Sequence, residues 1–190
     1  MASGKLIVLE GIDGCGKDTQ INLLKENLEF SLYKYPTKNF RMLTDYLERK
    51  ISLEHKSLFL LFLADIVEEQ KLIAEELDAG KTVILDRYVF STIAYELGSF
   101  GYDHAKTIVE NIGFLKPDKV ILMDISTEIS QERKKRQKDL DRYEEDKEYL
   151  EGVKNSFVKL YKEGFMAKRW YKIDASKEIS SINKEILEII

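Results

Sequence analysis

The sequence predicts an α/β fold with a mainly parallel sheet. Short apolar runs alternate along the chain with longer helical patterns, several of the apolar runs end in an acidic residue, and a glycine-rich segment follows the first run. This alternation is typical of strand–helix–strand units, in which helices cover a parallel sheet. The chain has 190 residues, 44% of them hydrophobic, which is enough for one core. We therefore expect a single domain over residues 1–190.

Five strands are expected. The first, LIVLE at 6–10, is fully apolar and bounded by Gly11, which indicates a buried central strand. The others are SLYKYP (31–36), TVILDRY (82–88), KVILMDIS (119–126) and WYKIDAS (170–176). Ligands of such sheets bind beyond the carboxyl ends of the strands, where this chain carries Glu10, Asp86, Asp124 and Asp174.

Helices are expected after these strands. Residues 19–28 place Ile21, Leu24 and Leu28 on one helical face, which is typical of an amphipathic helix. The further helical stretches are 40–50, the long segment 56–80 closed by Gly80, and the amphipathic segment 182–190.

Composition limits the possible partners. A net charge of −4 and a pI near 5.4 argue against binding of a nucleic-acid polymer, because such proteins usually have a basic surface. The single cysteine, Cys15, excludes an intrachain disulfide, and no apolar run approaches the ~20 residues of a membrane span. The first residues also lack the apolar segment of a secretion signal. We expect a cytoplasmic protein that binds neither nucleic acid nor a membrane.

The segment EGIDGCGKDTQ, residues 10–20, resembles the phosphate-binding loop G-x-x-x-x-G-K-[ST]. Gly11, Gly14 and Gly16 would let backbone N–H groups approach phosphate oxygens, and Lys17 adds a positive charge at a helix start. The plain alternative is an ordinary strand-to-helix turn. The apolar strand before the loop and the helix after it favour phosphate binding.

Asp18 departs from this pattern, which has a hydroxyl at that position to bind Mg²⁺. A carboxylate also binds Mg²⁺, directly or through water. Alternatively, Asp18 caps the helix and leaves Thr19 or water near the metal. The sequence alone leaves both alternatives open.

Two further segments carry candidate groups. Asp86 ends a strand, where it could organise Mg²⁺ or accept a proton, and Arg87 could neutralise a transferring phosphoryl group; the alternative is a helix cap or surface ion pair. The charged segment 131–146 is either a solvated helix face or a mobile lid. As a lid it would bring Arg133, Lys135 or Arg136 over the phosphates.

Four segments together resemble the thymidylate kinases: LIVLEGIDGCGKDTQ, DRYVFSTIAYE, KPDKVILMDI and DRYEED. The resemblance extends from Leu6 to about Ser176. It implies Mg²⁺-dependent transfer of the γ-phosphoryl group of ATP to dTMP, which gives dTDP. It also implies a three-layer P-loop nucleoside-monophosphate-kinase fold, with a five-stranded parallel sheet and a short helical lid at 131–146, and a homodimer.

The same resemblance assigns roles to individual residues. Asp13 would accept a hydrogen bond from the acceptor 3′-hydroxyl, Phe62 would stack on thymine, and Tyr95 would crowd the 2′ side of the sugar. The residues implied on the ATP side are Gly11, Ile12, Asp13, Gly14, Cys15, Gly16, Lys17, Asp18, Thr19, Arg133 and Ser176. Those implied on the dTMP side are Asp13, Lys38, Phe62, Ile66, Arg87, Ser91, Tyr95 and Tyr143. Asp18 and Asp86 would hold the metal, and the catalytic set is Asp13, Lys17, Asp86, Arg87, Arg133 and Arg136.

Three departures from the family pattern affect these assignments. Gly14 stands where some members have an arginine, which predicts that the lid supplies the cation, from Arg133 or Arg136. Lys38 replaces an arginine that grips the acceptor phosphate, and Ile66 replaces one that donates to a thymine carbonyl. Base discrimination is then looser, or another residue supplies it. The alternatives are a broader deoxynucleoside-monophosphate kinase and a nucleotide-binding protein without catalysis; the retained Lys17 and Arg87 argue against the second.

Overall fold

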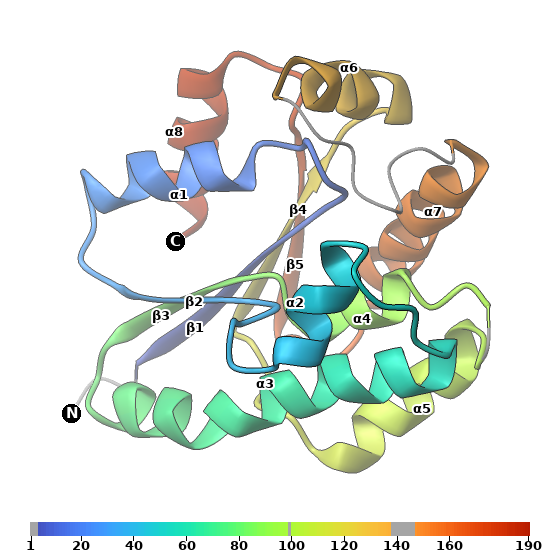
Figure 1. Ribbon diagram of the computed structural model, residues 1–190. Coiled ribbons are helices and arrows are strands. Elements are labelled where there is room, and N and C mark those ends of the chain that lie inside the picture. The colour runs from blue at the N-terminus through green and yellow to red at the C-terminus, as the bar shows by residue number, and fades with distance from the viewer. Residues whose placement is uncertain (1–3, 99, 138–146) are drawn as a thin grey trace.

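The computed structural model, which describes residues 4–98, 100–137 and 147–190, is built on a five-stranded parallel sheet (Figure 1). The strands are β1 (Lys5–Glu10), β2 (Ser31–Lys34), β3 (Thr82–Asp86), β4 (Lys119–Asp124) and β5 (Arg169–Asp174). Their order is β2-β3-β1-β4-β5, and all four neighbouring pairs run parallel. The predicted fold class and its five strands are confirmed.

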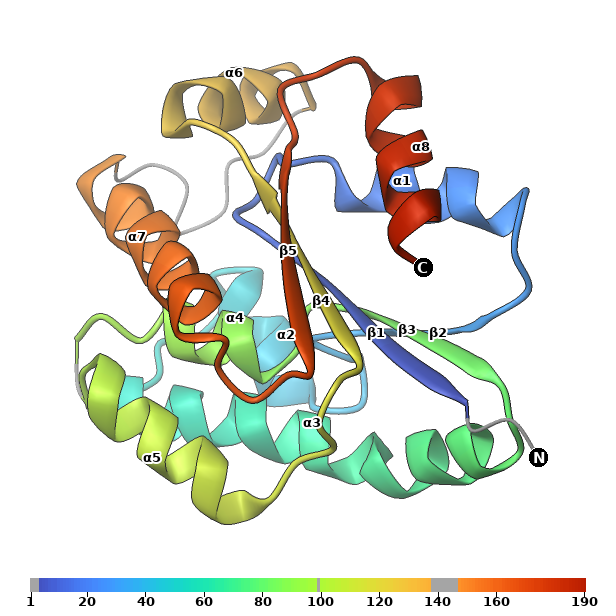
Figure 2. The ribbon, with the colours of Figure 1, turned by 180° about the vertical axis from the view of Figure 1, so that it is seen from behind.

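Helices cover both faces of the sheet and make three layers. Helices α1 (Lys17–Lys25) and α8 (Ile179–Ile189) lie on one face. The opposite face carries α3 (His55–Asp78), α4 (Val89–Ala94), α5 (Tyr102–Ile112) and α7 (Lys147–Glu163), as Figure 2 shows from behind. Helix α2 (Arg41–Leu47) packs on α3, and α6 (Thr127–Gln137) lies beyond the carboxyl end of β4. Within the described chain, no helix is both long and apolar enough to cross a membrane.

Three of these helices, α4, α5 and α7, were not predicted. Helix α4 has six residues, all of them buried, so no alternation of polar and apolar faces marks it in the sequence. Helix α6 occupies the first part of the expected lid, up to residue 137. The remainder of that segment, with Tyr143, lies outside the described residues.

The register of the central strands brings functional groups together at one edge. Lys34 at the end of β2 pairs with Asp86 at the end of β3, and Asp86 in turn pairs with Leu9 of β1. Strands β1, β3 and β4 are buried almost throughout because helices cover both of their faces. The glycine loop and Arg87 therefore leave the sheet from adjacent, rigid strands.

Candidate active site

A cavity of about 510 Å³ opens at the carboxyl ends of β1, β2 and β3. Helices α1, α3, α4 and α6 contribute most of the other lining residues. Most of the residues implied by the family resemblance line it: Asp13, Gly14, Cys15, Gly16, Lys17, Asp18, Thr19, Phe62, Ile66, Asp86, Arg87, Ser91, Tyr95 and Arg133. The fold thus gathers segments from residue 13 to residue 133 into one cleft.

Gly14 has no room for a side chain. Its backbone has φ +76°, and a Cβ there would meet the carbonyl oxygen of Ser130 at 2.8 Å. Ser130 also donates from Oγ to the carbonyl oxygen of Asp13, at 2.6 Å, so α6 holds the glycine loop directly. This contact explains why an arginine cannot follow Asp13 in this chain.

The ammonium of Lys17 lies over the same loop. Its Nζ donates to the carbonyl oxygen of Gly11 at 3.0 Å and contacts Cys15 Sγ at 3.5 Å. The side chain is only 7% exposed. Helix α1 therefore begins with a buried positive charge at its positive dipole end, a combination suited to an anionic ligand.

Asp18 does not cap α1. The cap position belongs to Gly16, which has no side chain, whereas Asp18 lies in the first turn and pairs with Lys34. The capping alternative is therefore wrong. The Lys34 ammonium also lies 3.0 Å from Asp86 Oδ2, so one lysine joins the two expected metal ligands.

Asp86 suits a metal ion held together with a nucleotide. Its side chain is 2% exposed, and its Oδ1 atom is buried without a hydrogen-bond partner among the described residues. In that part of the chain no three His, Cys, Asp or Glu side chains group closely enough to hold a metal alone. Mg²⁺ commonly uses one or two carboxylates plus substrate phosphates. Asp86, with Asp18 nearby, fits that mode.

Arg87 is the centre of a buried polar network rather than a helix cap or surface ion pair. Its guanidinium donates to Asp13 Oδ1 at 2.5 Å and to Ser91 Oγ at 3.0 Å, and lies 5.5 Å from the Tyr95 ring centroid. Its backbone has φ +71°, a conformation that costs a non-glycine residue about 1–3 kcal/mol and that often marks functional sites. The bond from Arg87 N to the Leu9 carbonyl, at 3.0 Å, fixes this turn.

Asp13 is held as an anion by its neighbours. Burial alone would raise its pKa, but Arg87 and then Lys17 hold the pKa of Asp13 well below its ordinary value. Tyr95 also donates from its hydroxyl to Asp13 Oδ2 at 3.0 Å. Asp13 can therefore accept a hydrogen bond throughout the neutral pH range.

Glu10 belongs to this network but was not assigned a role from the sequence. It is fully buried and accepts hydrogen bonds from Tyr88 N (2.8 Å), Ser91 N (3.1 Å) and Ser91 Oγ (2.6 Å). It thus fixes the start of α4 and the serine that contacts Arg87. Its position at a strand end was visible in the sequence, but the packing of α4 over it was not.

Replacing Glu10 by glutamine is expected to change how stability depends on pH. Burial raises the pKa of Glu10 from 4.5 to about 7, although Arg87 partly opposes it. The folded state therefore binds this proton more tightly, and the resulting stabilisation, present below pH 4.5, is lost as pH rises through 7. At ~1.4 kcal/mol per pKa unit, the wild type should lose about 2–3 kcal/mol relative to Glu10→Gln between pH 5 and pH 8.

Urea unfolding of both proteins at these two pH values measures the effect. Glutamine keeps the shape of the protonated acid but cannot ionise, so other titrating groups cancel in the comparison. A difference in unfolding free energy that stays constant from pH 5 to pH 8 would contradict the assignment to Glu10.

Helix α6 places two cations against the cleft. Arg133 donates to the carbonyl oxygens of Gly14 (3.4 Å) and Ala175 (3.0 Å), so it joins the glycine loop to the segment after β5. Lys134, not selected from the sequence, also lines the cleft. Arg136, one turn further along the helix, is exposed and does not line it. Of the two expected lid cations, only Arg133 is placed at the site.

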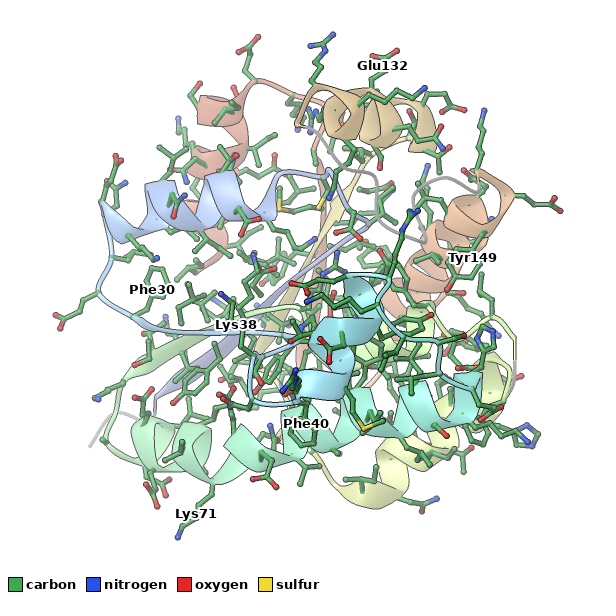
Figure 3. All side chains as sticks on the ribbon, viewed as in Figure 1. Phe30, Lys38, Phe40, Lys71, Glu132 and Tyr149 are labelled. Carbon is green, nitrogen blue, oxygen red and sulfur yellow. The ribbon has the colours of Figure 1, made fainter. Side chains whose placement is uncertain are left out.

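Two other expected contacts lie outside the cleft. Lys38 is exposed in the turn between β2 and α2 (Figure 3), because Asp65 holds the preceding Thr37 and directs the chain away. Ser176 is also exposed, and its N and Oγ atoms bond to Asp174 at 2.9 and 2.5 Å. Lys34 lines the cleft where Lys38 was expected.

The remaining acids at the strand ends have other roles. Asp124 pairs with Lys172 at 3.1 Å and does not line the cleft. Gly11 and Ile12 begin the glycine loop but do not line the cleft. The Gly11 carbonyl oxygen accepts a hydrogen bond from the Lys17 ammonium, and Ile12 is buried in the core. Of the four acids at the strand ends, only Asp86 lines the cleft.

The side of the cleft that faces α3 is mainly apolar. Phe62 and Ile66 face it from α3. Asp65 lies between them in the sequence, but its carboxylate already accepts from Thr37 N (2.7 Å) and from the Thr37 hydroxyl. Tyr149 of α7 borders the cleft and donates to the Tyr95 carbonyl at 2.6 Å (Figure 3).

Comparison with known proteins places these features in a family. Residues 9–186 match the family model described as thymidylate kinase. A probable thymidylate kinase 1 from Saccharolobus solfataricus is 37% identical over 98% of this chain and 96% of its own length. Human thymidylate kinase is 33% identical over 96% of this chain and 88% of its own. The solved structure of a Candida albicans thymidylate kinase, reported for broad substrate specificity, covers all of this chain and 92% of its own with a TM-score of 0.82 at 27% identity.

Proposed function

The chain belongs to the thymidylate kinase family, whose members transfer the γ-phosphoryl group of ATP to dTMP, and we propose that the cleft described above performs this reaction. The products are dTDP, for dTTP synthesis, and ADP. One observation supports the assignment of the cleft most strongly: the glycine loop with Lys17 and the Arg87–Asp13 pair line the same cavity.

On the donor side, the loop N–H groups and Lys17 bind the ATP phosphates. Asp86, with Asp18, would hold Mg²⁺ against them. When bound, this ion neutralises charge on the donor oxygens and helps to orient them. Arg133 already contacts the loop from α6, and it supplies the lid cation.

On the acceptor side, Asp13 accepts a hydrogen bond from the sugar 3′-hydroxyl, and Phe62 stacks on the base. Arg87 lies between the two halves of the cleft and binds both acceptor and donor phosphates. An acceptor phosphate oxygen then attacks the γ-phosphorus in line, and no covalent enzyme intermediate forms. Positioning and charge stabilisation supply the catalysis.

The direct test is ADP release from ATP and Mg²⁺ with dTMP, dUMP, dCMP, dGMP and dAMP offered separately. We expect turnover with dTMP that exceeds the acceptor-free background. Tight ATP binding without acceptor-dependent turnover would instead support the alternative of a nucleotide-binding protein that has lost catalysis.

Ile66 supports a second candidate, a kinase with broader acceptor range. It is apolar, 2% exposed and lines the cleft where the family resemblance implies an arginine. A missing hydrogen bond to the base edge costs about 1–3 kcal/mol of discrimination. Broad substrate specificity is reported for the Candida albicans enzyme, which has the same fold.

We expect kcat/KM for dUMP to lie within about 200-fold of that for dTMP, since the two bases share the same carbonyl edge and differ by one methyl group, which contributes ~1–3 kcal/mol in an apolar pocket. Steady-state kinetics with both acceptors measure the ratio. A preference for dTMP above about 10³-fold would show that another residue supplies the discrimination.

We also propose that the protein forms a homodimer through α3. Leu60 and Val67 lie seven residues apart on one side of this helix, and they are 51% and 43% exposed. Lys71 follows on the same side and points away from the body of the protein (Figure 3).

The cytoplasmic location expected from the sequence stays a prediction.

Replacing both Leu60 and Val67 by glutamate is expected to convert the dimer to a monomer, because charges would be buried at the interface without partners. Light scattering after size exclusion gives the mass directly. Leu72→Glu is the matched control, since Leu72 is equally exposed on α3 but lies on another side of the helix. Equal masses for the double variant and the control would contradict this interface.

A further inference from the structure

Lys34 occupies an unusual position for a lysine at a nucleotide site. Its ammonium lies 3.0 Å from Asp86 Oδ2 and also contacts Asp18 Oδ1. The strand register allows the first contact, because Lys34 and Asp86 are paired residues at the carboxyl ends of β2 and β3. A protein cation thus lies between the two carboxylates that would hold Mg²⁺.

The charges explain why it lies there. Asp86 is buried, and a buried carboxylate without a counter-ion is strongly destabilising. Asp18 adds a second negative charge where the family pattern has a neutral hydroxyl. Lys34 offsets one of these two negative charges, yet it leaves Asp86 Oδ1 without a partner among the described residues. The three groups together keep one excess negative charge and an unused carboxylate oxygen.

A metal ion could replace Lys34 as the partner of the two carboxylates. Lys34 is 54% exposed and Asp18 is 76% exposed, so water can solvate both groups when they separate. A lysine ammonium is a hydrated point charge on a flexible stem, without the fixed fork of an arginine. A divalent ion that satisfies both carboxylates, including the free Oδ1 atom, would displace it.

We propose that Lys34 is an internal counter-ion that holds the metal position until Mg²⁺ arrives with the nucleotide, and that it then leaves Asp18 and Asp86. This inference rests on the proposed function, in which Asp86 binds Mg²⁺. Its consequence is that the nucleotide-free protein binds divalent ions weakly. Metal entry is thereby coupled to ATP, whose phosphates supply the remaining ligands.

The test measures Mn²⁺ binding to the nucleotide-free protein by electron paramagnetic resonance. Lys34→Met should raise Mn²⁺ affinity at least about tenfold, because it removes a competing positive charge. The matched control is Lys38→Met, which removes the same charge four residues away but outside the cleft. The double variant Lys34→Met, Asp18→Ser should lose most of the gain, since one ligand is gone.

A second measurement, thermal melting, shows whether the variant is folded. Lys34→Met should melt at a lower temperature than the wild type, and millimolar Mg²⁺ should raise its melting temperature more than that of the wild type. Equal Mn²⁺ affinity in Lys34→Met and wild type, or an equal gain in Lys38→Met, would overturn the inference. Wild-type turnover of ATP and dTMP is assayed in parallel, because its absence would overturn the proposed function instead.

Discussion

Replacing Arg87 by methionine is expected to lower kcat for dTMP phosphorylation by about 10³-fold, since arginines that stabilise a transferring phosphoryl group contribute on this scale. The reason lies in how the guanidinium is held. Asp13, Ser91 and the Tyr95 ring fix it from three directions, and it is only 14% exposed. Little reorganisation is then needed when charge develops in the transition state.

Two variants separate charge from geometry at this position. Arg87→Lys keeps the charge but cannot reach Asp13 and Ser91 together, so it should recover only a small part of the activity. Arg41→Met is the matched control, because Arg41 is 91% exposed at the start of α2 and does not line the cleft. Steady-state kinetics that show Arg87→Lys close to wild type would mean that charge alone suffices.

Loss of the network must be distinguished from loss of the fold. Arg87→Met leaves Asp13 buried without its main counter-ion, so we expect lower stability as well. The double variant Arg87→Met, Asp13→Asn removes the unpaired charge and should regain part of that stability. It should not regain activity, because Asp13 is the proposed acceptor for the sugar hydroxyl.

Much of this fold was readable in the sequence because its central strands are buried on both faces. The apolar runs of β1, β3 and β4 have no polar alternation, and glycines or acids end them sharply. Helix α4 could not be found in the same way, since all of its residues are buried. The start of α4 is held by hydrogen bonds to Glu10, which lies far away in sequence.

Residues that line the cleft could be selected from the sequence where one segment carries the whole pattern, as in the loop from Asp13 to Lys17. Residues whose position depends on the pairing of two strands could not be selected in this way. Nothing local to the segment 31–38 shows that Lys34 enters the cleft and Lys38 leaves it. That outcome follows from the pairing of Lys34 with Asp86 and from the bonds between Thr37 and Asp65.

Glu10 and Lys134 are two further residues whose place in the site depends on packing between segments that are distant in sequence. Glu10 acquires its role when the start of α4 folds over it, and Lys134 enters the site because α6 lies against the glycine loop through Ser130. Neither contact has a local sequence pattern. Long-range packing, rather than residue type, explains why these two residues belong to the site while Arg136 is exposed.

Replacing Lys17 by methionine should have an effect of similar size, a loss of about 10²–10⁴-fold in kcat/KM for ATP. Its ammonium is positioned over the loop by a hydrogen bond to the Gly11 carbonyl. The lysine therefore contributes a prearranged charge at the outer donor phosphates, where the family reaction develops negative charge.

Exchange for the other basic residue is expected to give different results at Lys17 and at Arg87. Lys17 is nearly buried against the loop, so the larger guanidinium of Lys17→Arg cannot take the position of the ammonium, and this variant should be as inactive as Lys17→Met. Lys25→Met, at the exposed end of the same helix, is the matched control. Stopped-flow ATP binding and single-turnover kinetics separate weaker binding from slower transfer. If Lys17→Met changed only the affinity for ATP and left the single-turnover rate intact, the lysine would bind ground state and transition state equally, and the charge stabilisation would come from Arg87 and the lid.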